Sequence, residues 1–319
     1  MITDKLPPAG PAWAGSVMGV SVAAVLSGVH GLWLLSWMFL LGATVLAAAL
    51  IVGWVKLRNP GFGRAFMAPW AMVSMGLVSL GAAWTSVTGV WAFQTVAWFL
   101  AVPLALTVCA RQLQHFVGPP TFLWGLPTVA PMVAAASGLQ LARAEVLSQE
   151  LSIIVWELSG AMAILSGLTA PIVFLVVYVA LTRKRTSVPD AFAGTTWIPL
   201  GILGQSTVVA LLLGAGTTYG YIAFALAVPM FLFAAVIFTR ACLRGAGYTP
   251  AWWGSTFPVG VLGLGAHQMS VATASAWFDV LSLALLGLLL VHLAVCLSRG
   301  VAASRPSVTV PQPEPAAVR

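Results

Sequence analysis

Residues with the chemistry of an enzyme are scarce in this chain. There are seven acids and four histidines among 319 residues. No carboxylate pair falls inside an apolar segment, and no nucleophile elbow, phosphate-binding P-loop or HExxH motif is present. The acids fall mostly in turns or tails: Asp4, Glu145, Glu150, Glu157, Asp190, Asp279 and Glu314. These patterns indicate that the protein is not an enzyme.

The four histidines are the residues best suited to bind haem or a metal ion, but their positions do not converge. His30 and His115 fall in turns at opposite ends of apolar segments, while His267 and His292 fall at different depths. Such ligands must lie together, so we expect no metal and no cofactor. The cysteines lack paired spacing and are expected to be packing residues: Cys109, Cys242 and Cys296.

The composition indicates that the main solvent of this chain is the lipid bilayer. The chain is 60% hydrophobic and 7% charged, with a mean hydropathy of +1.00, whereas a soluble domain carries about 25% charged residues. Only helices or a closed barrel can span a bilayer. The apolar runs are continuous, without the alternation of strands, and therefore predict an all-α integral membrane protein.

Ten membrane-spanning helices are expected. The sixth is longer than the roughly 20 residues that a span needs, and we expect the extra residues mostly in a connection at 140–152. The predicted spans are Ala12–Gly28, Leu34–Val55, Phe66–Ser86, Val90–Ala110, Phe122–Leu139, Ile153–Leu181, Thr195–Gly214, Tyr219–Arg240, Ala251–Thr273 and Ala276–Leu297.

A proline recurs near the start of every odd-numbered span. By subtraction of residue numbers, Pro11, Pro69, Pro127, Pro199 and Pro258 are 58, 58, 72 and 59 residues apart. Such a period fits two spans and their turns, which predicts five helical hairpins. Proline inside a helix removes a hydrogen bond and kinks it. We therefore expect kinks at the last four prolines, and an inner ring of odd spans in quasi-five-fold arrangement around a central pore.

The mildly polar residues of the spans collect in the same odd-numbered segments. Hydroxyl and amide groups could line a pore, or could bond to the carbonyls of their own or a neighbouring helix. Both interpretations stay open. The candidates for pore lining are Ser16, Ser74, Thr128, Gln205, Ser206 and Thr256.

Basic residues predict the orientation. All 14 except Arg143 fall at one side of the predicted spans, which favours a multi-pass protein of the cell inner (plasma) membrane with both termini cytoplasmic. They form no stripe with aromatics and are expected to face lipid, not nucleic acid. The expected organisation is a cytoplasmic N-terminus at 1–11, a membrane domain at 12–297 and a disordered cytoplasmic tail at 298–319.

Three segments resemble one known family. They are Pro11-Ala-Trp-Ala-Gly-Ser-Val-Met-Gly19, Trp197-Ile-Pro-Leu-Gly-Ile-Leu-Gly-Gln-Ser206 and Trp252-Trp-Gly-Ser-Thr-Phe-Pro258. In order and spacing the chain resembles the tellurite-resistance and dicarboxylate transporter family, which includes the slow-type anion channels. The resemblance implies five hairpins around a pore, a homotrimer and transport of small anions. It also implies a phenylalanine that occludes the pore, which by motif is Phe257.

Two functions are consistent with the sequence. One is a small-anion channel or channel-like exporter with a weakly polar pore gated by Phe257. The alternative is a proton-coupled exporter of C4-dicarboxylate, sulfite or tellurite-related anions, for which Glu157 is the candidate coupling residue because acids within spans are costly and often functional. A membrane scaffold has little support, since the loops are short.

Overall fold

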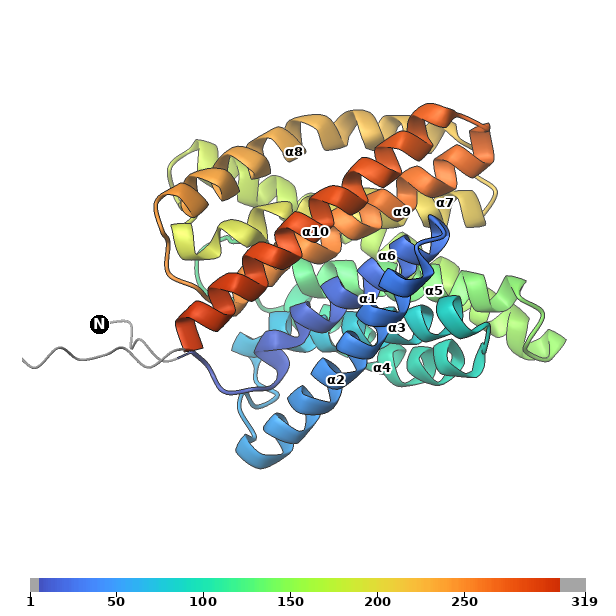
Figure 1. The fold of residues 1–319 in the computed structure, drawn as a ribbon, viewed down its shortest axis with the longest axis horizontal. Coiled ribbons are helices and arrows are strands. Elements are labelled where there is room, and N and C mark those ends of the chain that lie inside the picture. The colour runs from blue at the N-terminus through green and yellow to red at the C-terminus, as the bar shows by residue number, and fades with distance from the viewer. Residues whose placement is uncertain (1–5, 305–319) are drawn as a thin grey trace, which may run out of the picture.

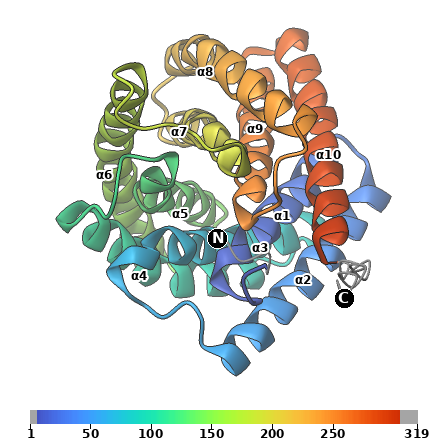
Figure 2. The same cartoon turned by 90° about the vertical axis from the view of Figure 1, so that its left-hand side faces the viewer.

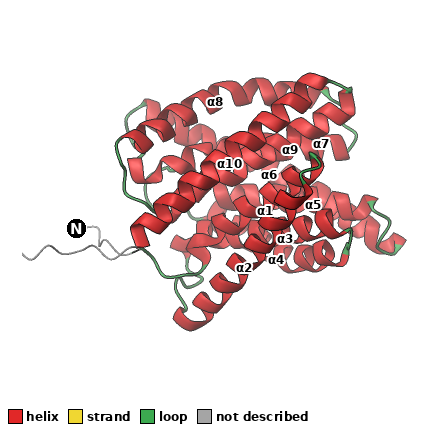
Figure 3. Ribbon diagram, viewed as in Figure 1, coloured by secondary structure: helices red, strands yellow, loops and turns green. Residues whose placement is uncertain are grey.

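The computed structural model describes residues 6–304 of the chain. In that range it consists of helices and connections without strands (Figures 1 and 3). The ten α-helices are α1 (Ala14–Val29), α2 (Trp33–Leu57), α3 (Met67–Thr88), α4 (Ala92–Gln114), α5 (Leu126–Arg143), α6 (Gln149–Thr182), α7 (Ile198–Leu212), α8 (Thr218–Leu243), α9 (Thr256–Thr273) and α10 (Ala276–Ser304).

Each odd-numbered helix is entered through a short 3₁₀ helix. The five 3₁₀ helices are η1 (Pro11–Trp13), η2 (Arg64–Phe66), η3 (Phe122–Gly125), η4 (Asp190–Trp197) and η5 (Pro250–Ser255). The repeating prolines lie at or just after these segments: Pro11 opens η1, and Pro69, Pro127, Pro199 and Pro258 lie in the first turns of their α-helices. Proline is tolerated there because the first N–H groups have no partner within the helix. These prolines therefore lie in the first turns, where each 3₁₀ start passes into its α-helix, and the kinks expected at the last four stay a prediction.

The odd helices form an inner ring and the even helices an outer wall (Figure 2). The percentage of residues that are buried, taken over the most apolar stretch of each segment, is 89% for α5 and 78% for both α1 and α7. The same percentage is only 11% for α2 and 22% for α8. Contacts of α1 with α3, α3 with α5, α5 with α7, α7 with α9 and α9 with α1 close the ring. The expected arrangement of five hairpins is thus confirmed.

Close approach between α7 and α9 depends on glycine. A Cβ atom on Gly204 would lie 2.6 Å from the backbone nitrogen of Leu262. Small residues allow such backbone contact between membrane helices. Gly204 therefore allows the inner helices α7 and α9 to lie this close together.

Nine of these helices, taken with their 3₁₀ starts, are long and apolar enough to cross a membrane. The tenth, α9, carries the polar pair His267 and Gln268 in its second half. It nevertheless closes the inner ring between α7 and α1. Its lower hydropathy is tolerated because protein surrounds it.

The extra length of the third repeat lies in helix and not in the connection where it was expected. α6 has 34 residues, which corresponds to about 51 Å of helix. The connection before it covers only residues 144–148, since α5 continues to Arg143. A helix of this length exceeds the hydrocarbon core of about 30 Å.

The connections define two faces. The terminal face, at the left of Figure 1, holds the 3₁₀ helices and the end of α10; the hairpin face holds the short turns at 30–32, 89–91, 144–148, 213–217 and 274–275. Arg143 is the single basic residue at the hairpin face among residues 6–304. The others belong to the terminal face: Lys56, Arg58, Arg64, Arg111, Arg183, Lys184, Arg185, Arg240, Arg244 and Arg299.

The C-terminal helix extends further than expected. α10 continues past Leu297 to Ser304, so the beginning of the expected tail at 298–319 is helical. Residues 1–5 and 305–319 lie outside the described part of the chain.

Candidate functional site

Three cavities follow one another inside the ring of odd helices. Their volumes are about 420, 20 and 210 Å³. The largest, here called the vestibule, is lined mainly by the second halves of the odd helices, with Phe257 at the start of α9 and Gln94 near the start of α4, and lies toward the hairpin face. The smallest lies between the first turns of the same helices, and the third lies at their starts on the terminal face.

The vestibule is weakly polar. Its polar lining consists of hydroxyl, amide and indole groups, with no acid, histidine, lysine or arginine among the described residues that line any of the three cavities. Four glutamines contribute, one each from α4, α5, α7 and α9: Gln94, Gln140, Gln205 and Gln268. Their amide N–H groups are donors without charge. The space can therefore offer hydrogen bonds to a small anion but no ion pair.

Gln94 organises one wall of the vestibule. Its Nε2 donates to Ser137 Oγ and Gln140 Oε1, both at 3.0 Å, and to the Ser137 carbonyl at 3.2 Å. Gln140, whose Oε1 accepts this bond, also lines the vestibule, so the two amides belong to the same wall. Thr85 Oγ1 accepts from the backbone nitrogen of Gln94 at 3.2 Å, which joins α3 to the same network.

Phe257 separates the vestibule from the smallest cavity. Among residues 6–304 it is the only one that lines both cavities, and it is 5% exposed. It is the second residue of α9 and follows the 3₁₀ start η5, so the junction between the two helix types places its ring beside the axis.

The space beyond Phe257 is narrow and apolar. The small cavity has Met18, Met72 and Met75 in its wall. It shares four residues with the cavity at the terminal face: Met72, Leu126, Ile198 and Gly254. The two are thus neighbours along the axis.

Only one of the six candidate pore-lining residues lines the vestibule, namely Gln205. The other five donate to backbone carbonyls. Ser16 bonds to Trp13 at 2.8 Å, Thr128 to Gly125 at 2.9 Å and Thr256 to Trp253 at 2.8 Å. Ser74 bonds to Ala101 at 3.0 Å and Ser206 to Leu203 at 3.2 Å. The helix-bonding alternative therefore describes these five hydroxyls.

Glu157 lies away from the cavities. It is exposed on α6, one of the outer helices, eight positions after Gln149 at the helix start. It lines none of the three axial cavities. Its carboxylate therefore has no contact with the space around the axis.

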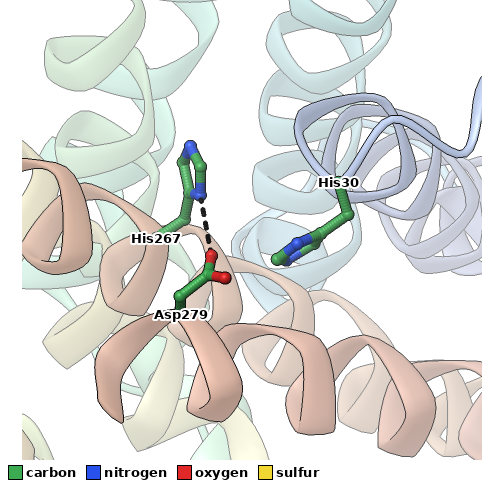
Figure 4. Close-up of side chains that lie close together, drawn as sticks. All are labelled: His30, His267 and Asp279. Atoms are coloured by element: carbon green, nitrogen blue, oxygen red, sulfur yellow. Dashed lines mark ion pairs between the residues drawn. The ribbon is translucent and has the colours of Figure 1, made fainter. Parts of the chain in front are cut away.

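A cluster of potential metal ligands is present, contrary to the expectation from the sequence. His30, His267 and Asp279 offer ligand atoms within 4.8 Å of one another (Figure 4). They lie far apart in sequence and meet because the turn after α1 packs near the end of α9 and the start of α10. Spacing along the chain carries no signal for this contact.

Sequence reasoning also missed most of the polar vestibule lining. Gln94 was overlooked because it belongs to an even-numbered helix, and Gln140 because the predicted fifth span ended at Leu139. Gln268 lies in a predicted span but was not singled out. The signal that could have found them is a carboxamide inside, or at the edge of, an otherwise apolar segment.

These features define a class of protein: a helical membrane protein with cavities along the axis of an inner helical ring. The chain belongs to the voltage-dependent anion channel family, whose model matches residues 9–301. This confirms the resemblance seen in the sequence.

Three curated relatives are fungal proteins. The chain is 30% identical over 184 residues to the sulfite efflux pump SSU1 of Arthroderma otae, and 29% identical over 184 residues to those of Arthroderma benhamiae and Trichophyton rubrum. Each alignment covers 50% of this chain and 48% of the relative. The chain thus spans about half the length of the curated relatives it matches.

Proposed function

We propose that this protein passes small anions along the axis of the inner ring and that Phe257 is its gate. The observation that carries the proposal is that Phe257, alone among the residues that the structure describes, lines both the vestibule and the small cavity. A phenyl ring across an apolar constriction opposes an ion both sterically and by dewetting. A rotation of this ring, or a small movement of α9, would join the two spaces.

The lining favours flux over tight binding. A fixed cation in the pore would hold an anion and slow its exit, whereas weak contacts at several places allow conduction. Here the attraction would come from the amide donors of Gln140, Gln205 and Gln268 and from the basic terminal face. We therefore expect anions to bind weakly and to leave quickly.

The substrate class is a small inorganic or organic anion. Sulfite is one candidate because the relatives are named as sulfite efflux pumps. C4-dicarboxylates and tellurite-related oxyanions are the others. An anion-replacement series with purified protein in planar bilayers ranks these substrates.

Phe257→Ala tests the gate. Its matched control is Phe238→Ala, because Phe238 is also 5% exposed but packs against Trp197 and His292 and lines none of the axial cavities. We expect Phe257→Ala to raise anion conductance and Phe238→Ala to leave single-channel conductance unchanged. Equal conductance of wild type and Phe257→Ala, at equal incorporation, would contradict the gate.

Proton-coupled export is the alternative, and no feature of the cavities favours it. The axial lining contains no titratable group in the part of the chain that the structure describes, and Glu157 is exposed on α6. Liposome flux without a pH gradient separates the two mechanisms. Flux that depends on the gradient in wild type and loses this dependence in Glu157→Gln would establish coupling.

We further propose a homotrimer in the inner (plasma) membrane, with lipid around the outer helices and the terminal face in the cytoplasm. The basic terminal face supports this orientation because short cytoplasmic loops are enriched in Lys and Arg. The trimer rests on the family resemblance. Light scattering of the purified protein, corrected for bound detergent, measures the number of chains.

A further inference from the structure

We propose that His30, His267 and Asp279 form a site for a divalent transition-metal ion, of the Zn²⁺ class, at the hairpin face beside the vestibule. The three ligand atoms lie within 4.8 Å of one another. This site is distinct from the proposed anion path, because none of the three residues lines an axial cavity.

Three helices bring the ligands together. His30 directly follows α1 and opens the turn to α2, His267 lies in the last turns of α9, and Asp279 lies in the first turn of α10. Figure 4 shows the carboxylate of Asp279 near the ring of His267, with His30 facing them from the side. His267 Nδ1 and Asp279 Oδ1 are 4.0 Å apart, and the two imidazole centroids are 5.7 Å apart.

The hydrogen bonding of the cluster leaves a place for a ligand. His267 Nδ1 is buried without a hydrogen-bond partner among the described residues. Buried polar atoms are normally satisfied, so an orphaned ring nitrogen points to a missing partner. His30 Nε2 lies 2.9 Å from Ser282 Oγ, which holds the ring from the α10 side. Asp279, with a side chain 57% exposed, supplies negative charge and access from solvent.

The donor set selects the kind of ion. Two imidazoles and one carboxylate suit Zn²⁺ and related transition metals, whereas Ca²⁺ and Mg²⁺ prefer oxygen ligands. Zn²⁺ takes such ligands at about 2.0–2.2 Å. The three ligand atoms, which lie within 4.8 Å of one another, would draw closer together on binding one ion at that distance. With three protein ligands, the fourth position is left for water or another small ligand.

An ion bound by these three residues would connect parts of the chain at the rim of the vestibule. Val29 and Gln268 are the chain neighbours of His30 and His267, and both line the vestibule. A bound ion would therefore tie the turn after α1 to the end of α9 and the start of α10 at the vestibule rim. Metal binding should raise the thermal stability of this part of the bundle, since a ligand that binds only the folded state stabilises it.

Calorimetric titration of Zn²⁺ into the purified, tag-free protein tests the site. We expect one ion per chain in wild type and a loss of affinity of about 100-fold or more in His267→Ala and Asp279→Asn, since even losing a partner that only supports a ligand costs 10–100-fold. His115→Ala is the matched control, because His115 is exposed on the terminal face. It should bind like wild type.

A spectroscopic measurement adds an independent readout. Co²⁺ bound in place of Zn²⁺ should give tetrahedral ligand-field bands that His267→Gln abolishes. Absence of Zn²⁺ binding in wild type, or binding that survives both His267→Gln and Asp279→Asn in folded protein, would overturn the site. Anion conductance measured in chelator tests the Phe257 gate separately, so either proposal can fail without the other.

Discussion

Gln94 on the outer helix α4 donates from Nε2 to Gln140 Oε1 on the inner helix α5 at 3.0 Å, inside the vestibule wall. This bond brings a residue of the outer wall into the lining of the axis. It occupies Gln140 Oε1 as an acceptor, while Gln140 also lines the vestibule. Polarity of the vestibule therefore depends on both layers of the bundle.

Gln94→Leu should weaken both stability and anion selection. The change removes the donor to Ser137 and Gln140, and a buried group that loses its partner costs about 1–3 kcal/mol. Gln140 would then be free to reorient, which lowers the preference for anions over cations. Thermal unfolding and reversal potentials under a salt gradient measure the two effects.

Gln112→Leu is the control for this substitution. Gln112 is also buried on α4, at 5% exposure, but lines none of the axial cavities. The selectivity of Gln112→Leu should match that of wild type. If both variants shift the reversal potential equally, the Gln94 network has no special part in selection.

A size series at position 257 tests how the constriction works. If the side chain blocks the axis by volume, conductance should rise in the order Trp, Phe, Leu and Ala. A barrier lowered by about 1.4 kcal/mol corresponds to a tenfold increase in rate, and we expect Phe257→Ala to exceed this. Single-channel recordings supply the values; an order unrelated to side-chain volume would speak against a steric gate.

Gly204→Ala should destabilise the ring at the contact of α7 with α9. The added Cβ would meet the backbone of Leu262 at 2.6 Å, and backbone cannot yield as a flexible side chain does. Overpacking of this kind costs about 1–3 kcal/mol. We expect a lower melting temperature in detergent.

Gly287→Ala provides the comparison for Gly204→Ala. Gly287 lies within α10, and a Cβ there would meet nothing within 4 Å. Replacing a helical glycine by alanine stabilises by about 0.5–1 kcal/mol. Its melting temperature should therefore equal or exceed that of wild type, and equal losses in both variants would refute the packing argument.

Labelling of single cysteines should distinguish the two faces. Ala215 is exposed on the hairpin face and Ser187 on the terminal face. In intact cells, a membrane-impermeant maleimide should modify Ala215→Cys, while Ser187→Cys should react only after the cells are opened. The opposite pattern would invert the proposed orientation. Wild type is the blank in both conditions: Cys109 and Cys296 are buried, and any reaction of the partly buried Cys242 is measured there and subtracted.

The recurring hydroxyls show where sequence reasoning succeeded and where it failed. Ser16, Thr128 and Thr256 recur at matching positions, and this recurrence suggested a polar pore. Each bonds to the carbonyl three residues earlier, where a 3₁₀ start passes into the α-helix. The repeat is real, but its physical meaning is the closure of a helix junction.

The sequence by itself determined that the chain lies in a lipid bilayer and that it forms ten helices in five repeated hairpins. It also determined that the basic residues lie almost entirely on one side of the spans. These depend on composition and spacing along the chain, which are local properties. The phenylalanine assigned by its motif also lies beside the axis.

The tertiary structure alone decided which polar groups meet. A helix can rotate about its own axis without changing its hydropathy, so spacing did not reveal that Ser74 turns to α4 or that Gln94 turns inward. The meeting of His30 with His267 likewise depends on how two distant turns pack. Packing between helices supplies this information because it selects one rotation and one set of neighbours for each.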